Sequence, residues 1–152
     1  MPVYNVYPST NPPLQPPQVL QHLGLVLPVE IHVPARRAAF LAANNQPLPQ
    51  PVVGEALVDT GASVCAVEET CLQSLGLRPV RQVRVSTPAG TQLQNLYFVR
   101  LSFPGTQMPP AERPVLGSDF AQGRLVVLVG REVLSQCVLI YNGPMGACTI
   151  SF

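Results

Sequence analysis

Residues that interrupt regular backbone structure are spread along the whole chain. Eighteen prolines and eleven glycines occur among its 152 residues, and they leave few stretches long enough for a helix of several turns. Hydrophobic residues still make up 47% of the chain, which is enough for a packed core in one domain. We therefore expect an all-β fold of short strands and turns, with one or two short helices.

Charge is sparse and balanced, which excludes several classes of partner. The chain has 9 basic and 8 acidic side chains and a formal net charge of +1. The basic residues, all of them arginines, are scattered from Arg36 to Arg131, so we expect neither nucleic acid nor a membrane surface as a partner. No apolar run reaches the roughly 18 residues of a spanning helix, and residues 1–10 lack the features of a secretory signal. We expect a soluble, cytoplasmic protein.

The cysteines show no metal-binding or disulfide pattern. They form no Cys-x-x-Cys pair, and they are Cys65, Cys71, Cys137 and Cys148. The two histidines, His22 and His32, lie far upstream of them, so the ligand spacing of a zinc site is missing. The sequence predicts four free thiols, no metal site and no cofactor.

The chain divides into two segments of different character. Residues 1–17 are rich in Pro, Asn, Ser and Tyr, contain two Pro-Pro steps and show no apolar periodicity. This composition predicts an extended arm or linker. Residues 18–152 contain the strand and helix patterns, and we assign them to one domain.

Alternating apolar residues predict the first strands of this domain. Val29, Ile31 and Val33 fall on one face of a strand, with Glu30 and His32 on the other. Residues 34–51 are predicted as a long excursion before the next strand. That strand, residues 52–58, ends directly at Asp59, and residues 64–75 predict a short helix that stops at a glycine.

Two hairpins and one apolar strand are predicted in the second half of the chain. Residues 80–85 and 92–103 alternate around the turn at residues 86–90, which predicts a hairpin. Residues 125–129 are a continuous apolar strand, followed by a short helix over residues 130–137. An Asn-Gly turn at residues 142–143 predicts a terminal hairpin.

One tripeptide carries the chemistry that this chain can perform. Asp59 leaves the end of an apolar strand and is followed by Thr60 and Gly61. Two carboxyls held close together can share a proton, because their like charges force their pKa values apart, and such a pair can act as both acid and base on a water molecule. The only other aspartate, Asp119, lacks a following Thr-Gly, and we interpret it as a turn residue that caps backbone amides.

The residues around Asp59 resemble a known active site. Ala56-Leu-Val-Asp-Thr-Gly-Ala-Ser63 resembles the motif of aspartic proteases, and Leu128-Val129-Gly130 resembles the hydrophobic element that crosses behind that loop in the same family. A hairpin lies between the two, in the order of one protomer of the retropepsin-like proteases of retroviruses, retrotransposons and bacteria. The resemblance covers approximately residues 23–152.

This resemblance implies a closed β-barrel protomer that is active as a symmetric homodimer. Each protomer would contribute one catalytic Asp59, Thr60 would lock the two loops together, and Gly61 would let the substrate backbone approach. Residues 85–91 would be a flap, and residues 148–152 would belong to the dimer-interface sheet. The implied substrate-binding residues are Ala62, Ser63, Val85, Thr87, Ala89, Gly90, Val129 and Gly130, with Val64 as a further apolar candidate.

One position differs from many viral members of that family. Ser63 stands where those proteins carry an acid that pairs with the equivalent of Arg131. We therefore expect Glu132 or another group to position the guanidinium of Arg131. We interpret Arg131 as a structural residue.

The sequence thus predicts an aspartic endopeptidase that cuts extended peptides next to hydrophobic residues, with no metal or cofactor. Its partners would be a second copy of the chain and a peptide or protein substrate. The alternative is a catalytically silent module of the same fold that dimerises and binds extended peptide. A third interpretation makes Asp59 a turn residue at a strand end.

Overall fold

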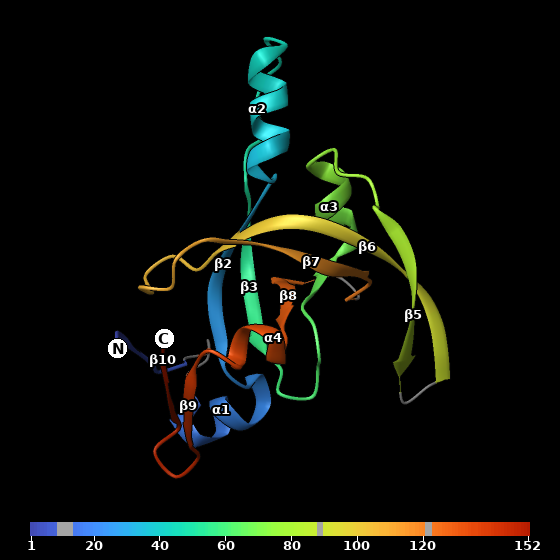
Figure 1. Cartoon of the computed structure of the whole chain (residues 1–152). Coiled ribbons are helices and arrows are strands. Elements are labelled where there is room, and N and C mark those ends of the chain that lie inside the picture. The colour runs from blue at the N-terminus through green and yellow to red at the C-terminus, as the bar shows by residue number, and fades with distance from the viewer. Residues whose placement is uncertain (9–13, 88–89, 121–122) are drawn as a thin grey trace.

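The computed structural model describes residues 1–8, 14–87, 90–120 and 123–152, and it is mainly β with short helices (Figure 1). The helices are α1 (Pro16–Leu23), α2 (Ala35–Ala43), α3 (Glu69–Ser74) and α4 (Arg131–Leu134). The strands are β1 (Val3–Val6), β2 (Val26–His32), β3 (Val52–Val58), β4 (Ala66–Glu68), β5 (Arg81–Thr87), β6 (Gly90–Ser102), β7 (Ala111–Ser118), β8 (Leu125–Val129), β9 (Val138–Asn142) and β10 (Ala147–Ser151). Among these described elements, no helix is long and apolar enough to cross a membrane.

Six strands pair in a ring around the core. The larger sheet has the order β2-β3-β8-β4-β7-β6-β5, and β2 also pairs with β6. Each of the six strands from β2 to β6 in this order therefore has a neighbour on both sides. Its buried residues include Val29 and Ile31 on β2, Val99 on β6 and Val127 on β8. The expected burial of Val29, Ile31 and Val33 is confirmed, because apolar residues that alternate along a strand share one face.

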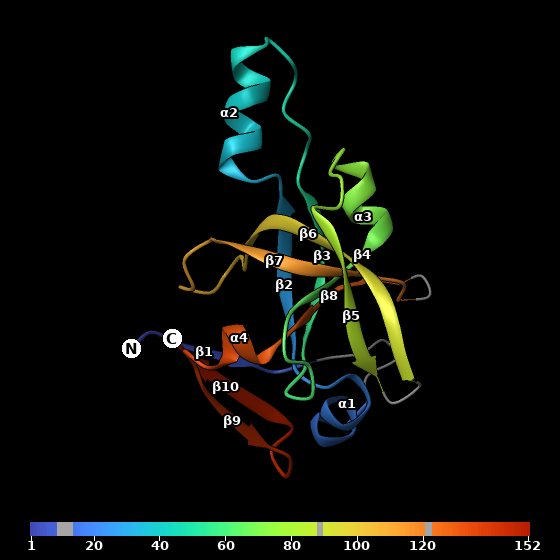
Figure 2. The same cartoon turned by 45° about the vertical axis from the view of Figure 1, so that its right-hand side comes forward.

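The predicted hairpin is confirmed as β5 and β6. Residues 96–101 of β6 pair with β7 on their other side, whereas its earlier residues pair only with β5. The hairpin consequently leaves the ring as a two-stranded ribbon (Figures 1 and 2). A two-stranded ribbon is only marginally stable by itself, so this part of the hairpin has less sheet pairing to support it than the strands of the ring.

Two local predictions are corrected. The excursion at residues 34–51 contains α2, which begins directly after Pro34 and is built mainly from the good helix formers Ala, Arg and Leu. The helix predicted over residues 64–75 is preceded by β4, and α3 starts only at Glu69. β4 is a strand because its main chain bonds β7 on one side and β8 on the other, a pairing that no local pattern reveals.

The predicted N-terminal arm is integrated into the fold. β1 pairs with β10, and β10 pairs with β9, in a three-stranded sheet formed by both ends of the chain (Figure 2). α1 begins at Pro16, where proline is tolerated because the first helical N–H groups need no intrahelical partner. Val19 and Leu20 of α1 are buried. The boundary predicted between residues 17 and 18 thus falls inside α1.

Candidate active site

Strand β3 delivers Asp59 to one end of the ring. β3 runs parallel to β8, and Val58 lies opposite Val129 in the register. Directly beyond this pair the Asp59 N–H donates to the carbonyl oxygen of Val129 at 3.0 Å. The apolar strand therefore ends in a carboxylate whose main chain is tied to a second buried strand.

The turn after β3 orients the Asp59 carboxylate. The Gly61 N–H donates to Asp59 Oδ1 at 2.8 Å, and the Ala62 N–H donates to the Asp59 carbonyl at 3.2 Å. Asp59 is half-buried, whereas Thr60 and Gly61 are exposed. A carboxylate that accepts a backbone N–H is held in one orientation, with one side open to solvent.

The segment that follows β8 packs against this turn. A Cβ atom at Gly130 would lie 2.5 Å from the carbonyl carbon of Val64, so only glycine allows the two backbones to approach this closely. The Arg131 N–H donates to the Ala62 carbonyl at 2.9 Å, and the Glu132 N–H donates to the Ser63 carbonyl at 3.3 Å. The structure thus brings together the two motifs that the sequence singled out.

Val129 and Gly130 lie directly behind the Asp59 turn. Both residues are buried beneath the turn, and the Val129 side chain packs in the hydrophobic core. They hold the Asp59 turn in place. Their contact with a substrate stays a prediction.

The Arg131 side chain closes the turn. Its Nη1 donates to the Thr60 carbonyl at 2.8 Å and to the Gly61 carbonyl at 3.2 Å, and its Nη2 donates to Ser63 Oγ at 2.9 Å. Many viral members of the family that the sequence resembles carry an acid at the position of Ser63. Here the Ser63 hydroxyl accepts the hydrogen bond from Arg131 instead. Of the two alternatives expected, Glu132 or another group, the second is confirmed, because Ser63 and the two carbonyls hold the guanidinium.

Glu132 instead holds Cys65, which follows the Asp59 turn in the chain. Its Oε1 accepts the Cys65 N–H at 2.6 Å, and its Oε2 is buried without a hydrogen-bond partner. The Gly130 N–H lies 3.4 Å from Cys65 Sγ. Burial, reinforced by a hydrogen bond with Glu132, raises the pKa of the Cys65 thiol to about 12. Cys65 is thus a neutral, structural thiol, and sequence analysis had no signal for its contact with Glu132.

The cysteines do not form a metal site with other side chains in the described residues. All four cysteines are free, as the sequence predicted. In the parts of the chain that the structure describes, no three His, Cys, Asp or Glu side chains gather in a way that could hold a metal ion.

Asp119 lies at the other end of β8 from Asp59. It follows β7, and β8 then starts at Leu125, opposite Glu55 at the middle of β3. The five residues of β8 separate the two ends by roughly 16 Å. Asp119 lines a different cavity, together with Glu68 and Cys71. The two aspartates of one chain therefore do not form a pair.

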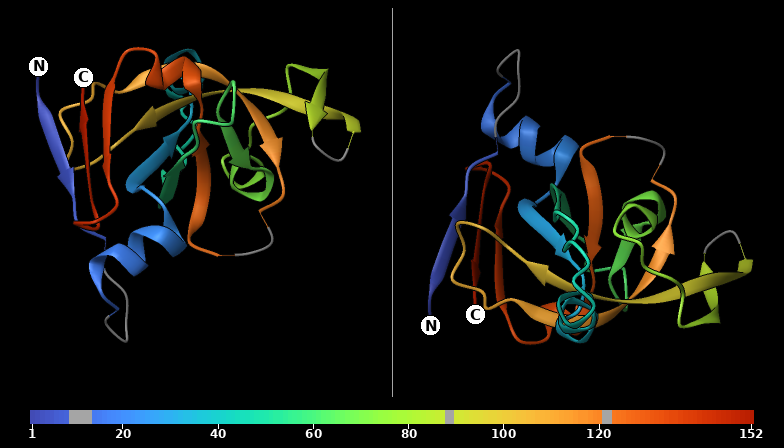
Figure 3. Two further views of the ribbon diagram at one scale, coloured as in Figure 1. Left: turned by 90° about the horizontal axis from the view of Figure 1, so that it is seen from below. Right: turned by 90° about the horizontal axis from the view of Figure 1, so that it is seen from above.

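The predicted flap residues lie on the projecting hairpin. Val85 is half-buried on β5, and Thr87 pairs with Gly90, whose positive φ of 114° suits glycine. Ala89 lies outside the described residues. The hairpin projects to one side of the molecule (Figure 3), on an element separate from the Asp59 turn.

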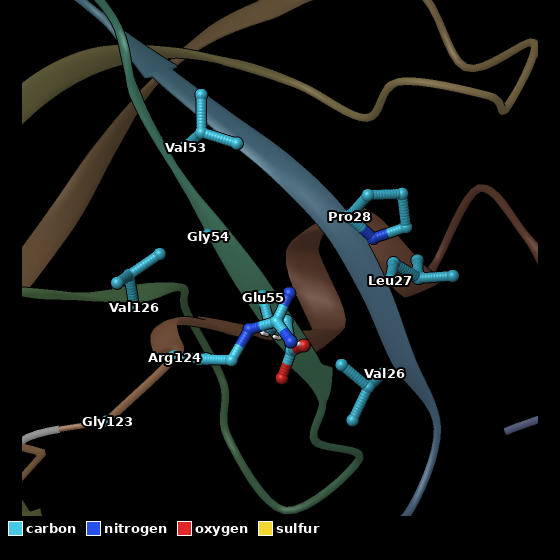
Figure 4. A pocket seen from close by; sticks show the side chains of 9 residues that line it. All are labelled: Val26, Leu27, Pro28, Val53, Gly54, Glu55, Gly123, Arg124 and Val126. Atoms are coloured by element: carbon cyan, nitrogen blue, oxygen red, sulfur yellow. Dashed lines mark ion pairs between the residues drawn. The ribbon is translucent and has the colours of Figure 1, made fainter. Parts of the chain in front are cut away.

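A cavity on the outer face of the sheet is distinct from this site. It has a volume of about 520 Å³, and its floor is formed by β2 and β3 (Figure 4). Arg124 Nε and Glu55 Oε1 form an ion pair at 3.2 Å at its edge. Its lining residues are Val26, Leu27, Pro28, Val53, Gly54, Glu55, Gly123, Arg124 and Val126. The Asp59 turn does not contribute to it.

Comparison with known proteins agrees with this geometry. The aspartyl protease family matches residues 43–120, a segment that contains β3, the Asp59 turn and the β5–β6 hairpin. Among solved structures, the solution structure of the simian foamy virus (mac) protease is similar, with 20% sequence identity and a TM-score of 0.47. That similarity covers 73% of this chain and 92% of the viral chain. No curated protein matches the chain. Because the family match spans more than half of the sequence, the chain belongs to the aspartyl protease family.

Proposed function

We propose that this protein is an aspartic endopeptidase that acts as a symmetric homodimer of the retropepsin-like type. The observation that carries the proposal is the fixed Asp59 carboxylate, which accepts the Gly61 N–H at 2.8 Å on a turn tied to β8. Such a rigid turn at a strand end is what preorganised acid–base chemistry requires. A silent binding module would have no use for the costly like-charge pair that two such carboxylates would form.

The need for a second copy follows from counting carboxylates. Water activation by carboxyls alone requires two of them within proton-sharing distance, and the chain contains a single Asp-Thr-Gly. Asp119 is separated from Asp59 by the length of β8. A second copy, related by a two-fold axis at the Asp59 turn, supplies the missing carboxylate.

The mechanism assigns opposite protonation states to the two Asp59 carboxyls. The ionised one takes a proton from a bound water as the oxygen attacks the scissile carbonyl carbon. The protonated one donates its proton to the carbonyl oxygen and later assists departure of the amine. In such a dimer the exposed Thr60 would bind the partner's turn, and Gly61 would leave room for the substrate backbone.

The sheet formed by the chain ends is our proposed dimer contact. Its outer strands are β1 and β9. The register places Val3, Val138 and, two pairs further along, Ile140 on the same face, and all three side chains are more than half exposed. Exposed apolar side chains beside open strand edges favour association with another chain.

The substrate proposed here is an extended peptide with hydrophobic residues on both sides of the cut. Ala62 and Val64 follow Asp59 closely in the chain, and Val85, Thr87 and Gly90 belong to the hairpin that would close over the peptide. Ala89 stays a predicted residue of the same flap. Ser63 is held by Arg131, so its role is to shape the turn. The cytoplasmic location predicted from the sequence stays a prediction.

The test is cleavage of a mixed peptide library between about pH 4 and 7, the range of coupled carboxyl pKa values, by the native chain and by Asp59→Asn. We expect cleavage by the native chain only, quenched by a statine-type transition-state mimic. Cleavage that survives Asp59→Asn would contradict the proposal. Silence of a folded, dimeric native sample, with retained peptide binding, would establish the binding module instead.

A further inference from the structure

A second surface feature lies at the opposite end of the molecule from Asp59. Helix α2 stands off from the ring of strands (Figures 1 and 2), and a cavity of about 520 Å³ lies beside it. We call this cavity the Phe40 groove, and its lining residues are Pro34, Arg36, Arg37, Phe40, Phe98 and Glu112. β3 starts near α2 and ends at Asp59, so its seven residues separate the groove from the turn by roughly 20 Å.

The groove exposes two aromatic side chains on separate elements. Phe40 comes from α2 and is 54% exposed, and Phe98 comes from β6 and is 42% exposed. Two exposed phenylalanines that line one cavity form an apolar surface that water solvates poorly. Burying them against a ligand would be favourable.

Helix α2 has little packing of its own. All nine of its residues are described by the structure, and Leu41 is the one that is buried. Its N-cap residue, Pro34, offers no side-chain hydrogen bond, the first turn has no acidic residue, and the Ala35 N–H is bound by Glu112 from β7. Isolated helices this short are marginal in water, and most of their stability in proteins comes from packing. A partner that covers Phe40 would supply the packing that the protomer does not.

The charges around the groove are mainly positive. Arg36 and Arg37 are exposed in the first turn of α2, where the helix dipole adds positive potential. Arg37 also lines an adjoining cavity with Arg78. Glu112 is the one acid among the described residues that line the two cavities, and its Oε1 already accepts the Ala35 N–H. The Arg37 guanidinium lies 5.4 Å from the centre of the Phe40 ring, which places positive charge directly beside the apolar surface.

We propose that the Phe40 groove binds an acidic peptide segment that carries one large apolar side chain. The apolar side chain would insert between Phe40 and Phe98, and its acidic neighbours would pair with Arg36 and Arg37, whose guanidinium groups suit carboxylates. A protein bound through such a segment would leave the Asp59 turn accessible. The inference does not depend on catalysis.

The test measures binding without turnover, in the full chain carrying Asp59→Asn. The probe is a fluorescent heptapeptide of Asp and Glu with one central Phe. The protein is titrated into the probe up to about 1 mM, a concentration that detects a Kd in the millimolar range, and binding is followed by fluorescence anisotropy. Two matched peptides carry Ala in place of Phe, or Asn and Gln in place of the acids. We expect saturable binding of the probe and at least a tenfold weaker affinity for each matched peptide.

The protein variants locate the site. Phe40→Ala, and separately the Arg36→Glu and Arg37→Glu pair, should each weaken probe binding at least tenfold. These side chains are exposed, so the fold should be retained, as checked by circular dichroism. The matched controls are Leu93→Ala and Arg81→Glu, which are exposed changes on the hairpin and should leave the affinity unchanged.

Several outcomes would overturn the inference. The first is the absence of saturable binding, and the second is equal binding of the neutral peptide. The third is a loss of affinity in the hairpin variants with none in the groove variants, because that result would place the peptide beside Asp59. A single-stranded oligothymidylate that binds the groove more tightly than the probe would also overturn it, because stacking and phosphate contacts would then define the ligand. Failure here would leave cleavage by Asp59 untouched.

Discussion

Gly130 shows how one absent side chain positions the active-site turn. A Cβ atom there would lie 2.5 Å from both the Val64 carbonyl carbon and Glu132 Oε2. Gly130→Ala should therefore push the turn away from β8, lower the free energy of unfolding by about 1–3 kcal/mol and reduce peptide cleavage. Urea unfolding measures the first effect.

Gly143→Ala is the matched control for this change. An added Cβ at Gly143 would meet only Tyr141 Cε1, at an ordinary contact of 3.6 Å. We expect unfolding and cleavage to stay within error of the native chain. Equal destabilisation by the two substitutions would contradict the close approach at Gly130.

Arg131 holds the turn through the shape of its guanidinium as well as through its charge. Its guanidinium reaches two carbonyls and one hydroxyl, which the single ammonium of lysine cannot do with the same geometry. Arg131→Lys should keep the fold and lower kcat by about tenfold or more, because small misplacements of catalytic groups are costly. Arg124→Lys, at the outer-face pair with Glu55, should leave kcat unchanged. A kcat for Arg131→Lys equal to that of the native chain would refute this role.

The Cys65 thiol predicts a loss of stability in alkali. Its pKa in the fold is raised to about 12 from the ordinary value of 9.0, so above pH 9.0 the unfolded chain releases a proton that the folded chain retains. The stabilisation is fully present below pH 9.0 and is lost as the pH rises toward 12, with a slope of at most about 1.4 kcal/mol per pH unit. Urea unfolding at several pH values should show a smaller slope for Cys65→Ala; identical slopes would rule the thiol out.

At the scale of elements, α1 tests how firmly the N-terminal segment belongs to the fold. Leu20 is 1% exposed on this helix, whereas Leu23, three residues later, is 45% exposed. Leu20→Ala should lower the free energy of unfolding by about 2–5 kcal/mol, and Leu23→Ala should change it by less than about 0.5 kcal/mol. Similar small effects of both changes, measured by urea unfolding, would mean that α1 is not part of the core.

Strand patterns were predictable because they depend on neighbours in sequence. The alternation of Val29, Ile31 and Val33 places β2 correctly. The terminal hairpin is present as predicted, but Asn142 ends β9 and the turn covers residues 143–146. β4 was missed because Ala66 and Val67 form a strand only between β7 and β8. α2 was missed because its sequence, rich in Arg and Ala, shows no clear helical period of large apolar residues.

At the scale of the whole molecule, the two-chain active site can be tested by mixing subunits. Native and Asp59→Asn chains should exchange into heterodimers that contain a single Asp59 carboxylate. After random exchange of equal amounts, about a quarter of the dimers keep two carboxylates, so activity should fall to about half of that of the native chains kept separately. Activity that stays unchanged by mixing, after exchange is verified by mass spectrometry, would place a complete site in one chain.

The local chemistry of the protein was determined by the sequence alone. An apolar strand that ends in Asp59-Thr60-Gly61, and a later Leu-Val-Gly, are contiguous patterns, and their meaning depends on residues next to each other. The tertiary structure alone decided how that turn is held: Arg131 on Ser63, Glu132 on Cys65, and Val129 as a buried support. It also decided that the N-terminal strand joins β10. These contacts join residues far apart in the chain, and their free energy depends on distances and burial that exist only after the sheet has closed.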